Sequence, residues 1–492
     1  MNLTSLTFLS FTLIVIVIYY LVPGKSQNIL LLLASYIFYC SWDWHFAIIL
    51  GAITIFNFYL TKLFQGSLTL KVNSINKNPN IARRSILWIG ILINISALIF
   101  FKQSDFFISK FQSLLSHLGL IDHIGMLRIL LPVGMSFYVL QAISYLVDSY
   151  QGHISNNVSF VNVALYLVYF PKLLSGPIER AGSFLPKLSV SRVVDNQQIT
   201  QSVAMILIGL MRKVVVADVI IARIPPNFYK SPDSFSAIDL SFWWIAFMIS
   251  LYNDFAGYTS IVRGISGLLG IDLSPNFENP FFSTSITEFW NHWHMTLSHW
   301  LRDYIYFPLS RFLRRYNQNR TFIPNIVIPP LITMFLCGLW HGESWNYVLW
   351  GLLMGIWIAS EQLNSVFGSR DLNSTQLNPW HPKKILQWIM FLIILFLVFV
   401  PFMFNDIETS FIFFQSLLTK WLPPITLLGW RLPVLAFILA AIIDLWQYTR
   451  KDELIFLRYN PKIQSILLAL SLILIFLGFH ANPASQFIYQ GF

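Results

Sequence analysis

Charged residues are scarce in this chain of 492 residues: they make up 11% of the total, against 56% hydrophobic and 16% aromatic residues. Soluble domains carry about a quarter of charged residues, so this composition excludes an ordinary soluble protein. No stretch is long and polar enough to form a separate soluble domain of its own. The composition therefore predicts a single membrane domain over residues 1–492, with the lipid bilayer as its surroundings.

Several motifs that mark other classes of protein are also missing. The chain has 2 cysteines, Cys40 and Cys337, which excludes a disulfide framework. It has no glycine-rich phosphate loop between a strand and a helix, and no G-x-S-x-G nucleophile motif, which argues against covalent serine catalysis. It shows no internal repeat, which weakens the case for a transporter built from duplicated halves.

Acidic residues are outnumbered, with 22 against 32 lysines and arginines, and the formal net charge is +10. In a membrane protein such an excess belongs to cytoplasmic loops rather than to a nucleic-acid site, so we expect no nucleic-acid partner. Two basic clusters are predicted to face the cytoplasm and anionic lipid. Their members are Lys62, Lys71, Lys77, Arg83 and Arg84 in the first, and Arg311, Arg314, Arg315 and Arg320 in the second.

Long apolar runs, by contrast, are abundant, and they predict an all-α, polytopic membrane protein with about 11–13 transmembrane or re-entrant helices. Some predicted spans are too short for a simple crossing. The spans are 6–23, 29–40, 45–61, 85–101, 128–150, 160–176, 199–222, 239–260, 322–341, 345–363, 385–404, 431–448 and 463–479. Proline, glycine and charge interrupt the runs between about 131 and 351. Broken backbone at membrane depth is tolerated where it is buried or lines a cavity, so this region is predicted to form the site.

The most informative segment ends at His341. Residues 331–340 are apolar, Pro329-Pro330 precede them, and Gly342 follows the histidine, which predicts a helix between the prolines and the glycine. Eleven residues span about 16 Å, roughly half of a hydrocarbon core, so His341 is predicted near the middle of the bilayer. Because an ionisable side chain at that depth is costly, we predict that His341 is a functional residue. The alternative is a buried histidine satisfied by hydrogen bonds.

The densest polar cluster runs from Glu288 to Asp303. As one helix it would place Trp293, Trp300 and Tyr304 on an amphipathic stripe, with His294 outside the polar ridge. On such a helix His292 and His294 diverge by about 200°, so no metal site is predicted. A buried histidine bonded to a backbone carbonyl is an equally weighted alternative for His294.

Two further polar clusters interrupt apolar sequence. Ser175–Arg180 includes Glu179 and Arg180, and Asn253–Tyr258 includes Asp254 and Tyr258. Each alone is typical of a helix-end turn or an interhelical pair. Together they predict the polar lining of one internal path.

Taken in order, these segments resemble the signature of the membrane-bound O-acyltransferase family. The resemblance covers about 131–351 and is closest to the bacterial branch with the alginate O-acetyltransferase membrane component, the peptidoglycan O-acetyltransferases and the teichoic-acid D-alanylation protein. The matching segments are Leu131–Tyr138, Ser175–Arg180, Asp254–Tyr258, Trp290–Ser298, Trp300–Tyr304, Leu339–Gly342, Ser344–Asn346 and Leu349–Gly351.

The resemblance implies that His341 is essential and that His294 belongs to the same site. It also implies a ring of helices around a central tunnel, in the bacterial plasma membrane, that links a cytoplasmic acyl thioester to hydroxyls of an extracytoplasmic polysaccharide such as alginate. Acetyl-CoA is the expected co-substrate, with no bound cofactor. The residues expected to line the site and tunnel are Trp290, Asn291, Arg302, Asp303, Glu179, Arg180, Asp254, Tyr258, Trp340 and Asn346.

A neutral imidazole suits the task of taking the acceptor's hydroxyl proton. We assign His341 as general base and His294, or Asn291 beside it, as stabiliser of the oxyanion; the reverse assignment of the two histidines stays open. Arg311, Arg314 and Arg315 are expected to hold the donor's phosphates. A periplasmic or cell-surface acetyltransferase is the expected partner in a relay. A flippase for a polysaccharide precursor and a noncatalytic scaffold are the alternatives from other classes.

Overall fold

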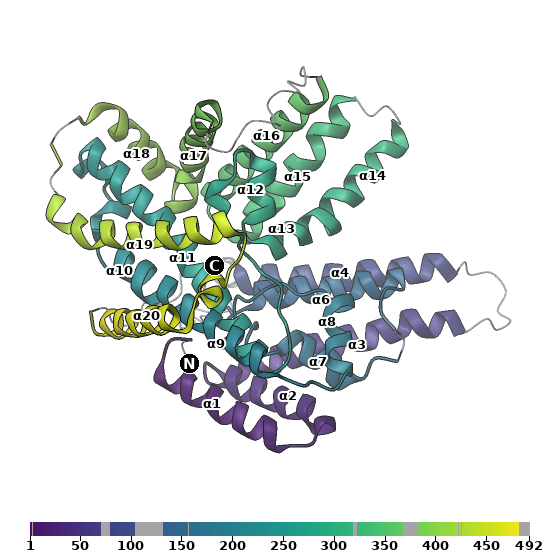
Figure 1. Cartoon of the computed structure of the whole chain (residues 1–492). Coiled ribbons are helices and arrows are strands. Elements are labelled where there is room, and N and C mark those ends of the chain that lie inside the picture. The colour runs from purple at the N-terminus through teal and green to yellow at the C-terminus, as the bar shows by residue number, and fades with distance from the viewer. Residues whose placement is uncertain are drawn as a thin grey trace, which may run out of the picture. The chain divides into compact units, whose positions relative to one another are not determined.

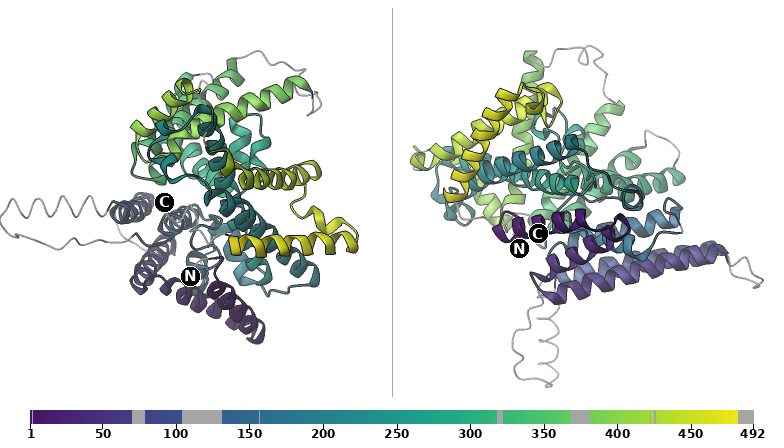
Figure 2. Two further views of the ribbon diagram at one scale, coloured as in Figure 1. Left: turned by 90° about the vertical axis from the view of Figure 1, so that its left-hand side faces the viewer. Right: turned by 60° about the horizontal axis from the view of Figure 1, so that its bottom comes forward.

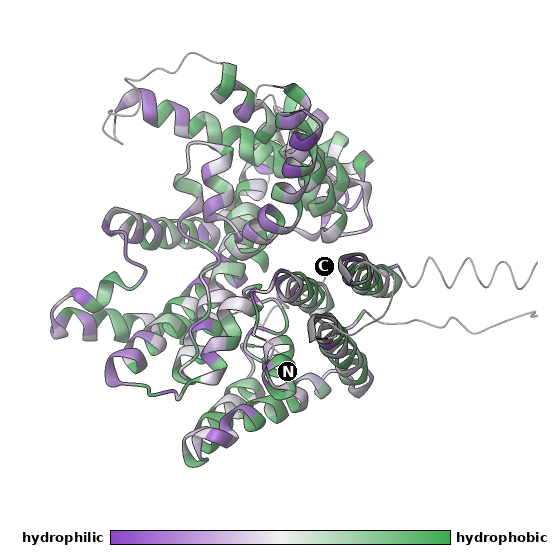
Figure 3. Cartoon of the chain, turned by 90° about the vertical axis from the view of Figure 1, so that its right-hand side faces the viewer, coloured by the Kyte–Doolittle hydropathy of each residue, from purple (hydrophilic) through white to green (hydrophobic). Residues whose placement is uncertain are grey.

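The computed structural model describes residues 1, 3–69, 79–103, 131–155, 157–317, 322–367, 381–421, 423–424 and 426–481. Within these ranges every regular element is a helix (Figure 1), which confirms the predicted all-α fold. Among the described helices, 6 are long and apolar enough to cross a membrane, and α1 (Leu6–Leu21) is a shorter apolar helix. Hydrophobic residues dominate these helices (Figure 3). The chain is a multi-pass membrane protein. Lys71, Lys77 and Arg320 of the predicted basic clusters lie outside the described residues.

Each predicted span contains a described helix, but the boundaries differ. The 160–176 span forms a helix only over Phe160–Val168 and then turns. A helix at Ile407–Thr419 was not predicted; the Asp406 carboxylate caps it by accepting a hydrogen bond from the Thr409 N–H at 2.7 Å. Apolar runs therefore located the long helices, while the 13-residue helix at Ile407–Thr419 was missed.

The first compact unit comprises residues 1–199 and 265–273. Within it α2, α3 and α7 pack against one another, and α6 packs against α3 and α4 (Figure 2). Its helices are α1, α2 (Gly24–Cys40), α3 (Trp44–Thr69), α4 (Pro79–Lys102), α6 (Met135–Gln151), α7 (Phe160–Val168) and α8 (Ala181–Ser189). The buried Lys172 ammonium, in the turn after α7, donates to the Gln141 side chain and, at 2.6 Å, to the Tyr166 carbonyl.

The second compact unit comprises residues 200–264 and 274–492 and holds both candidate histidines. Two π-helical turns, Met211–Ala217 and Arg302–Tyr306, interrupt its helices. Its other helices are α9 (Asn196–Leu210) and α11 (Ala237–Leu268), which reach into the first unit's ranges, then α10 (Asp218–Ile221), α12 (Ile286–His292), α13 (Met295–Leu301), α14 (Phe307–Tyr316), α15 (Ile323–His341), α16 (Trp345–Phe367), α17 (Pro382–Met403), α18 (Ile407–Thr419), α19 (Arg431–Arg450) and α20 (Pro461–Ala481).

Helices α15 and α16 lie side by side (Figure 1), and glycines allow their close contact. A Cβ atom added at Gly338 would lie 2.3 Å from the Tyr347 carbonyl oxygen, and one at Gly351 would lie 2.3 Å from that of Met334. Real Cβ atoms do not approach carbonyl oxygens so closely, so a larger residue here would separate the helices.

The structure agrees with the predicted 322–341 span and corrects the other prediction, in which the helix that carries His341 starts at Pro329-Pro330. Helix α15 has 19 residues and begins at Ile323, with Pro329 and Pro330 inside it rather than at its start. Helices that cross membranes tolerate internal proline when neighbours satisfy the freed backbone groups, and both prolines are buried. At about 1.5 Å per residue α15 is about 28 Å long, close to a full crossing. The inference that His341 lies at mid-bilayer because its helix is half-length is therefore wrong, whereas the predicted helix end at Gly342 is confirmed.

Candidate active site

His341 is the last residue of α15 and is 4% exposed, inside a box of aromatic rings. Its imidazole makes edge-on contacts with Trp350 and Phe402, with ring centroids 5.2 Å and 5.1 Å away, and lies 4.8 Å from the ring of Trp340. Gly342 ends the helix, and a Cβ there would lie 2.2 Å from the Tyr347 ring. The close α15–α16 pair therefore fixes where this imidazole lies.

The same aromatic cluster extends from His341 to the neighbourhood of His294. Phe402 contacts Phe399 at 5.9 Å between centroids, and Phe399 contacts Trp293 at 5.9 Å. Trp293 is buried and directly precedes His294 in the chain. The two predicted catalytic histidines thus border one continuous cluster of aromatic side chains.

The predicted single helix over Glu288–Asp303 is wrong. Helix α12 ends at His292, α13 begins at Met295, and His294 between them has φ 40° and ψ 51°. This left-handed conformation is uncommon for a residue other than glycine, although histidine is among those that adopt it more often. The argument against a metal ion shared by His292 and His294 assumed one continuous helix that turns about 100° per residue. Because the helix is broken between them, that argument no longer holds.

His294 is 1% exposed and contacts two phenylalanine rings. Phe255 meets it edge-on at 4.7 Å between centroids, and Phe277 stacks on it at 6.5 Å. Burial lowers the pKa of His294 to about 3, because the cation would lose its hydration. The imidazole is therefore neutral at physiological pH, and a neutral imidazole both donates and accepts a hydrogen bond.

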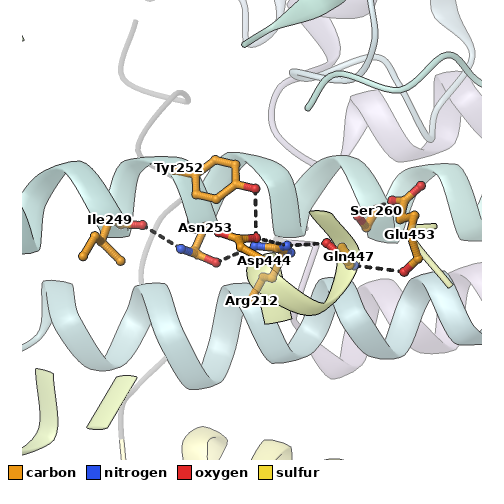
Figure 4. A network of polar contacts seen from close by, with 8 residues as sticks. All are labelled: Arg212, Ile249, Tyr252, Asn253, Ser260, Asp444, Gln447 and Glu453. Carbon is orange, nitrogen blue, oxygen red and sulfur yellow. Dashed lines mark hydrogen bonds and ion pairs between the residues drawn. The ribbon is translucent and has the colours of Figure 1, made fainter. Parts of the chain in front are cut away.

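A polar cavity of about 200 Å³, which we call the Arg212 cavity, is lined in part by Phe277, whose ring contacts His294. In its wall the Arg212 guanidinium donates to Asn253 Oδ1 at 2.9 Å, to Gln447 Oε1 at 2.8 Å and to the Asp444 carboxylate (Figure 4). The Tyr252 hydroxyl donates to the same carboxylate at 3.1 Å. These contacts tie the π-helical turn after α9 to α11 and α19.

A second cavity, of about 220 Å³ and here called the Trp290 cavity, collects three of the predicted lining residues. Trp290, Asn291 and Arg302 all line it. The Trp290 ring lies 6.0 Å from that of Trp350, which contacts His341. The Arg302 guanidinium donates to the adjacent Asp303 carboxylate at 2.9 Å.

The remaining predicted residues of this unit have identifiable partners. Asp254 is buried in α11 and forms an ion pair with Lys213 at 2.7 Å, which is also paired with Asp218 at 2.7 Å. The Asn346 amide donates to the Phe404 carbonyl at 2.8 Å and joins the start of α16 to the α17–α18 turn. Tyr258 is buried in α11. Their predicted role as tunnel lining stays a prediction.

Glu179 and Arg180 lie in the first unit, just before α8. Glu179 is buried, and its carbonyl accepts a hydrogen bond from the Tyr166 hydroxyl at 2.9 Å. Tyr166 also reaches the Gln141 carbonyl at 3.2 Å, so this turn is anchored to α6 and α7.

In the part of the chain that the structure describes, no group of three His, Cys, Asp or Glu side chains has the arrangement of a metal site. The absence of a bound metal stays a prediction.

Sequence reasoning missed the residues that hold His294. Asn276 and Phe277 reach this region only because the 274–279 segment folds back against the break between α12 and α13, where Asn276 bonds Met295 and Thr296 and Phe277 contacts the His294 ring. One local signal was available: Ser285 and Glu288 have capping-box spacing, and Ser285 Oγ accepts from the Glu288 N–H at 3.1 Å. That signal marks the start of a new, short helix at Ile286.

Comparison with known proteins identifies relatives of this chain. The model of the membrane-bound O-acyltransferase family matches residues 152–404. A probable alginate O-acetylase of Azotobacter vinelandii is 30% identical over 80% of this chain and 73% of that protein. A peptidoglycan O-acetyltransferase of Helicobacter pylori is 29% identical over 81% and 73%, respectively. A teichoic acid D-alanyltransferase of Streptococcus thermophilus is 29% identical over 46% and 55%.

Proposed function

We propose that this chain, which belongs to the membrane-bound O-acyltransferase family, moves an acetyl group from acetyl-CoA in the cytoplasm toward hydroxyls of a polysaccharide outside the bacterial plasma membrane. Membership of the family makes it an O-acyltransferase. The relatives named for alginate and peptidoglycan O-acetylation favour acetyl as the acyl group and a cell-envelope polymer as the acceptor.

One observation carries the proposal: His341 ends a membrane-length helix, and the Trp350 ring beside it also contacts Trp290, which lines the Trp290 cavity. A general base at the end of a span, linked through the Trp350 and Trp290 rings to a cavity of about 220 Å³, supports a site where a donor and an acceptor meet.

The distribution of basic residues supports opposite sides for donor and acceptor. Helix α14 carries Arg311, Arg314 and Arg315 in a ten-residue stretch without acidic residues, directly before α15. By the positive-inside tendency α15 begins at the cytoplasmic face, so His341 lies toward the outer face. This placement favours His341 as the group that meets the acceptor.

In the proposed reaction a hydroxyl oxygen of the partner protein, or of a small carrier that serves it, attacks the thioester carbonyl carbon while His341 takes the hydroxyl proton. The carbonyl oxygen becomes an oxyanion, which a neutral His294 or the Asn291 amide stabilises by donating a hydrogen bond. The C–S bond then breaks, the ester forms, and the departing thiolate takes the proton from the imidazolium of His341. Protons and electrons balance without a metal or a redox partner.

We further propose that a second protein receives the acetyl group outside the membrane. The acetyl group is uncharged and crosses apolar surroundings at little cost, whereas the donor's phosphates stay in water. In this proposal Arg311, Arg314 and Arg315 of α14 lie at the cytoplasmic face and hold those phosphates by charge-assisted hydrogen bonds.

The experiment uses proteoliposomes with acetyl-CoA on the α14 side and polysaccharide on the other side. We expect free CoA and acetylated polymer only when the partner acetyltransferase is added. Efficient polymer acetylation by the chain alone would overturn the relay. Failure to release CoA with the partner and polymer present, combined with movement of a polysaccharide precursor, would favour the flippase alternative.

A further inference from the structure

His294 is held in a conformation that costs free energy. With φ 40° and ψ 51° it is one of three non-glycine residues with positive φ in the described ranges. Such a conformation persists only when its surroundings hold it in place. The contacts that hold this backbone in place are therefore part of whatever His294 does.

Backbone hydrogen bonds clamp the chain on both sides of His294. The N–H of Glu278 donates to the His292 carbonyl at 3.1 Å, and the N–H of Met295 donates to the Asn276 carbonyl at 2.9 Å. The segment 276–278 thus runs against 292–295 like a short antiparallel pair. His294 lies inside this clamp, one residue before α13 begins.

The Asn276 side chain completes the clamp. Its Oδ1 accepts a hydrogen bond from the Thr296 N–H at 3.2 Å and another from the Thr296 hydroxyl at 2.6 Å. Asn276 is fully buried and Thr296 is 8% exposed, so water does not compete for these bonds. Because the Thr296 N–H can only donate, the Asn276 side chain must turn its oxygen, and not its NH₂ group, toward α13. A side-chain acceptor here satisfies a free N–H of the first turn of α13, as capping residues do.

The same loop also builds the wall on which the imidazole rests. Phe277, between the two clamping residues, stacks on His294 and meets Trp293 edge-on at 5.2 Å. Any rotation of the loop that breaks the Asn276 contacts therefore moves the stacked ring as well. The loop fixes both the backbone and the ring plane of His294.

From this geometry we propose that Asn276 is a positioning residue of the acyltransferase site, acting through Thr296 and the start of α13 to hold the His294 imidazole where the reaction needs it. Asn276 itself has no role in bond making or breaking. The proposal rests on the proposed participation of His294 in acyl transfer, and it adds the residues that set its position.

The predicted effect follows from how steeply reaction rates depend on placement. A misplacement of about 1 Å by a distant mutation lowers a rate by about 10²-fold. Asn276→Ala removes the acceptor and is expected to lower kcat by that amount with little change in KM for acetyl-CoA. Thr296→Val keeps the shape and the N–H but removes the hydroxyl, so a loss of about tenfold is expected, equivalent to one hydrogen bond to a buried group. Thr296→Ser retains the hydroxyl and should keep near-wild-type activity.

The test combines a chemical readout of His294 with the rate of CoA release from acetyl-CoA, on the full chain in nanodiscs. Diethyl pyrocarbonate modifies accessible neutral imidazoles, and peptide mass spectrometry reports the extent at His294. We expect His294 to be protected in the wild type and in Thr296→Ser, and modified in Asn276→Ala and Thr296→Val. Thr419→Val, an exposed threonine in α18 that bonds the Gln415 carbonyl, is the matched control and should change nothing.

A double variant separates this proposal from the proposed function. If Asn276 acts through His294, then Asn276→Ala adds no further loss in a His294→Ala background. The positioning role is overturned if the rate losses of Asn276→Ala and His294→Ala multiply in the double variant. It is also overturned if His294 stays as protected as in the wild type in both Asn276→Ala and Thr296→Val. Full activity of His294→Ala would instead refute the participation of His294 in the reaction, whatever the chemical modification shows.

Discussion

The surroundings of the two histidines differ in kind. His341 ends a 19-residue apolar helix, and Gly342 directly follows it. His294 lies in a strained turn between two helices of 7 residues each, held by a loop that is distant in sequence. The first position is set by local sequence and by the packing of adjacent helices. The second is set by hydrogen bonds between segments, which explains why substitutions far from His294 in sequence are expected to disturb it.

The largest expected effect comes from His341→Ala. Removing a general base lowers a rate by about 10²–10⁴-fold, so polymer acetylation in cells should fall by that factor while membrane level and melting temperature stay near wild type. His480→Ala, at the exposed end of α20, is the control. Wild-type acetylation in His341→Ala would remove the base from the mechanism.

The next-largest expected effect tests whether the position of His341 depends on the packing of α15 against α16. Gly351→Ala places a Cβ against the Met334 carbonyl and should destabilise the protein by about 1–3 kcal/mol, with loss of activity as α15 moves. Gly24→Ala, whose Cβ would have nothing within 4 Å, should leave melting and activity unchanged. Thermal unfolding in detergent compares the two. Equal melting temperatures for both variants would show that close α15–α16 contact is not required.

We expect His294 to make the stability of the protein depend on pH. Its pKa is lowered to about 3 from an ordinary value of 6.5, so between these values the unfolded chain binds a proton that the native chain does not. This contribution to stability is present above pH 6.5 and is lost as pH falls toward 3. His294→Asn removes it, and asparagine also accepts the left-handed backbone. We expect a smaller drop in melting temperature from pH 7 to pH 5 for His294→Asn than for wild type; identical drops would contradict the assignment.

The smallest expected effect is that of a chelator. We predict that the purified chain contains no stoichiometric zinc and that EDTA leaves activity unchanged. Elemental analysis that finds about one zinc per chain, lost in His294→Ala, would contradict this.

These two regions also mark what could be predicted from the sequence. Apolar runs and the glycine after His341 correctly predicted the long helices and the helix end, since both depend on local composition. The two prolines suggested a helix start, but they lie inside α15. A membrane helix continues through proline when neighbouring helices satisfy the freed backbone groups. The break at His294 could not be predicted from helical periodicity, because the chain around it is bonded to Asn276, which lies 20 residues before its partner Thr296 in sequence. The residue types that mark the site stay a prediction, whereas the geometry around His294 is set by tertiary contacts that helical periodicity does not contain.

The most direct test of the central claim, that both histidines act in one reaction, is a double-variant cycle on CoA release in proteoliposomes with partner and polymer present. Groups that act as a unit give strongly non-additive losses. We predict that His294→Ala/His341→Ala is no slower than His341→Ala within a factor of about three. Losses that multiply, or a His294→Ala variant as fast as wild type, would contradict a single shared site.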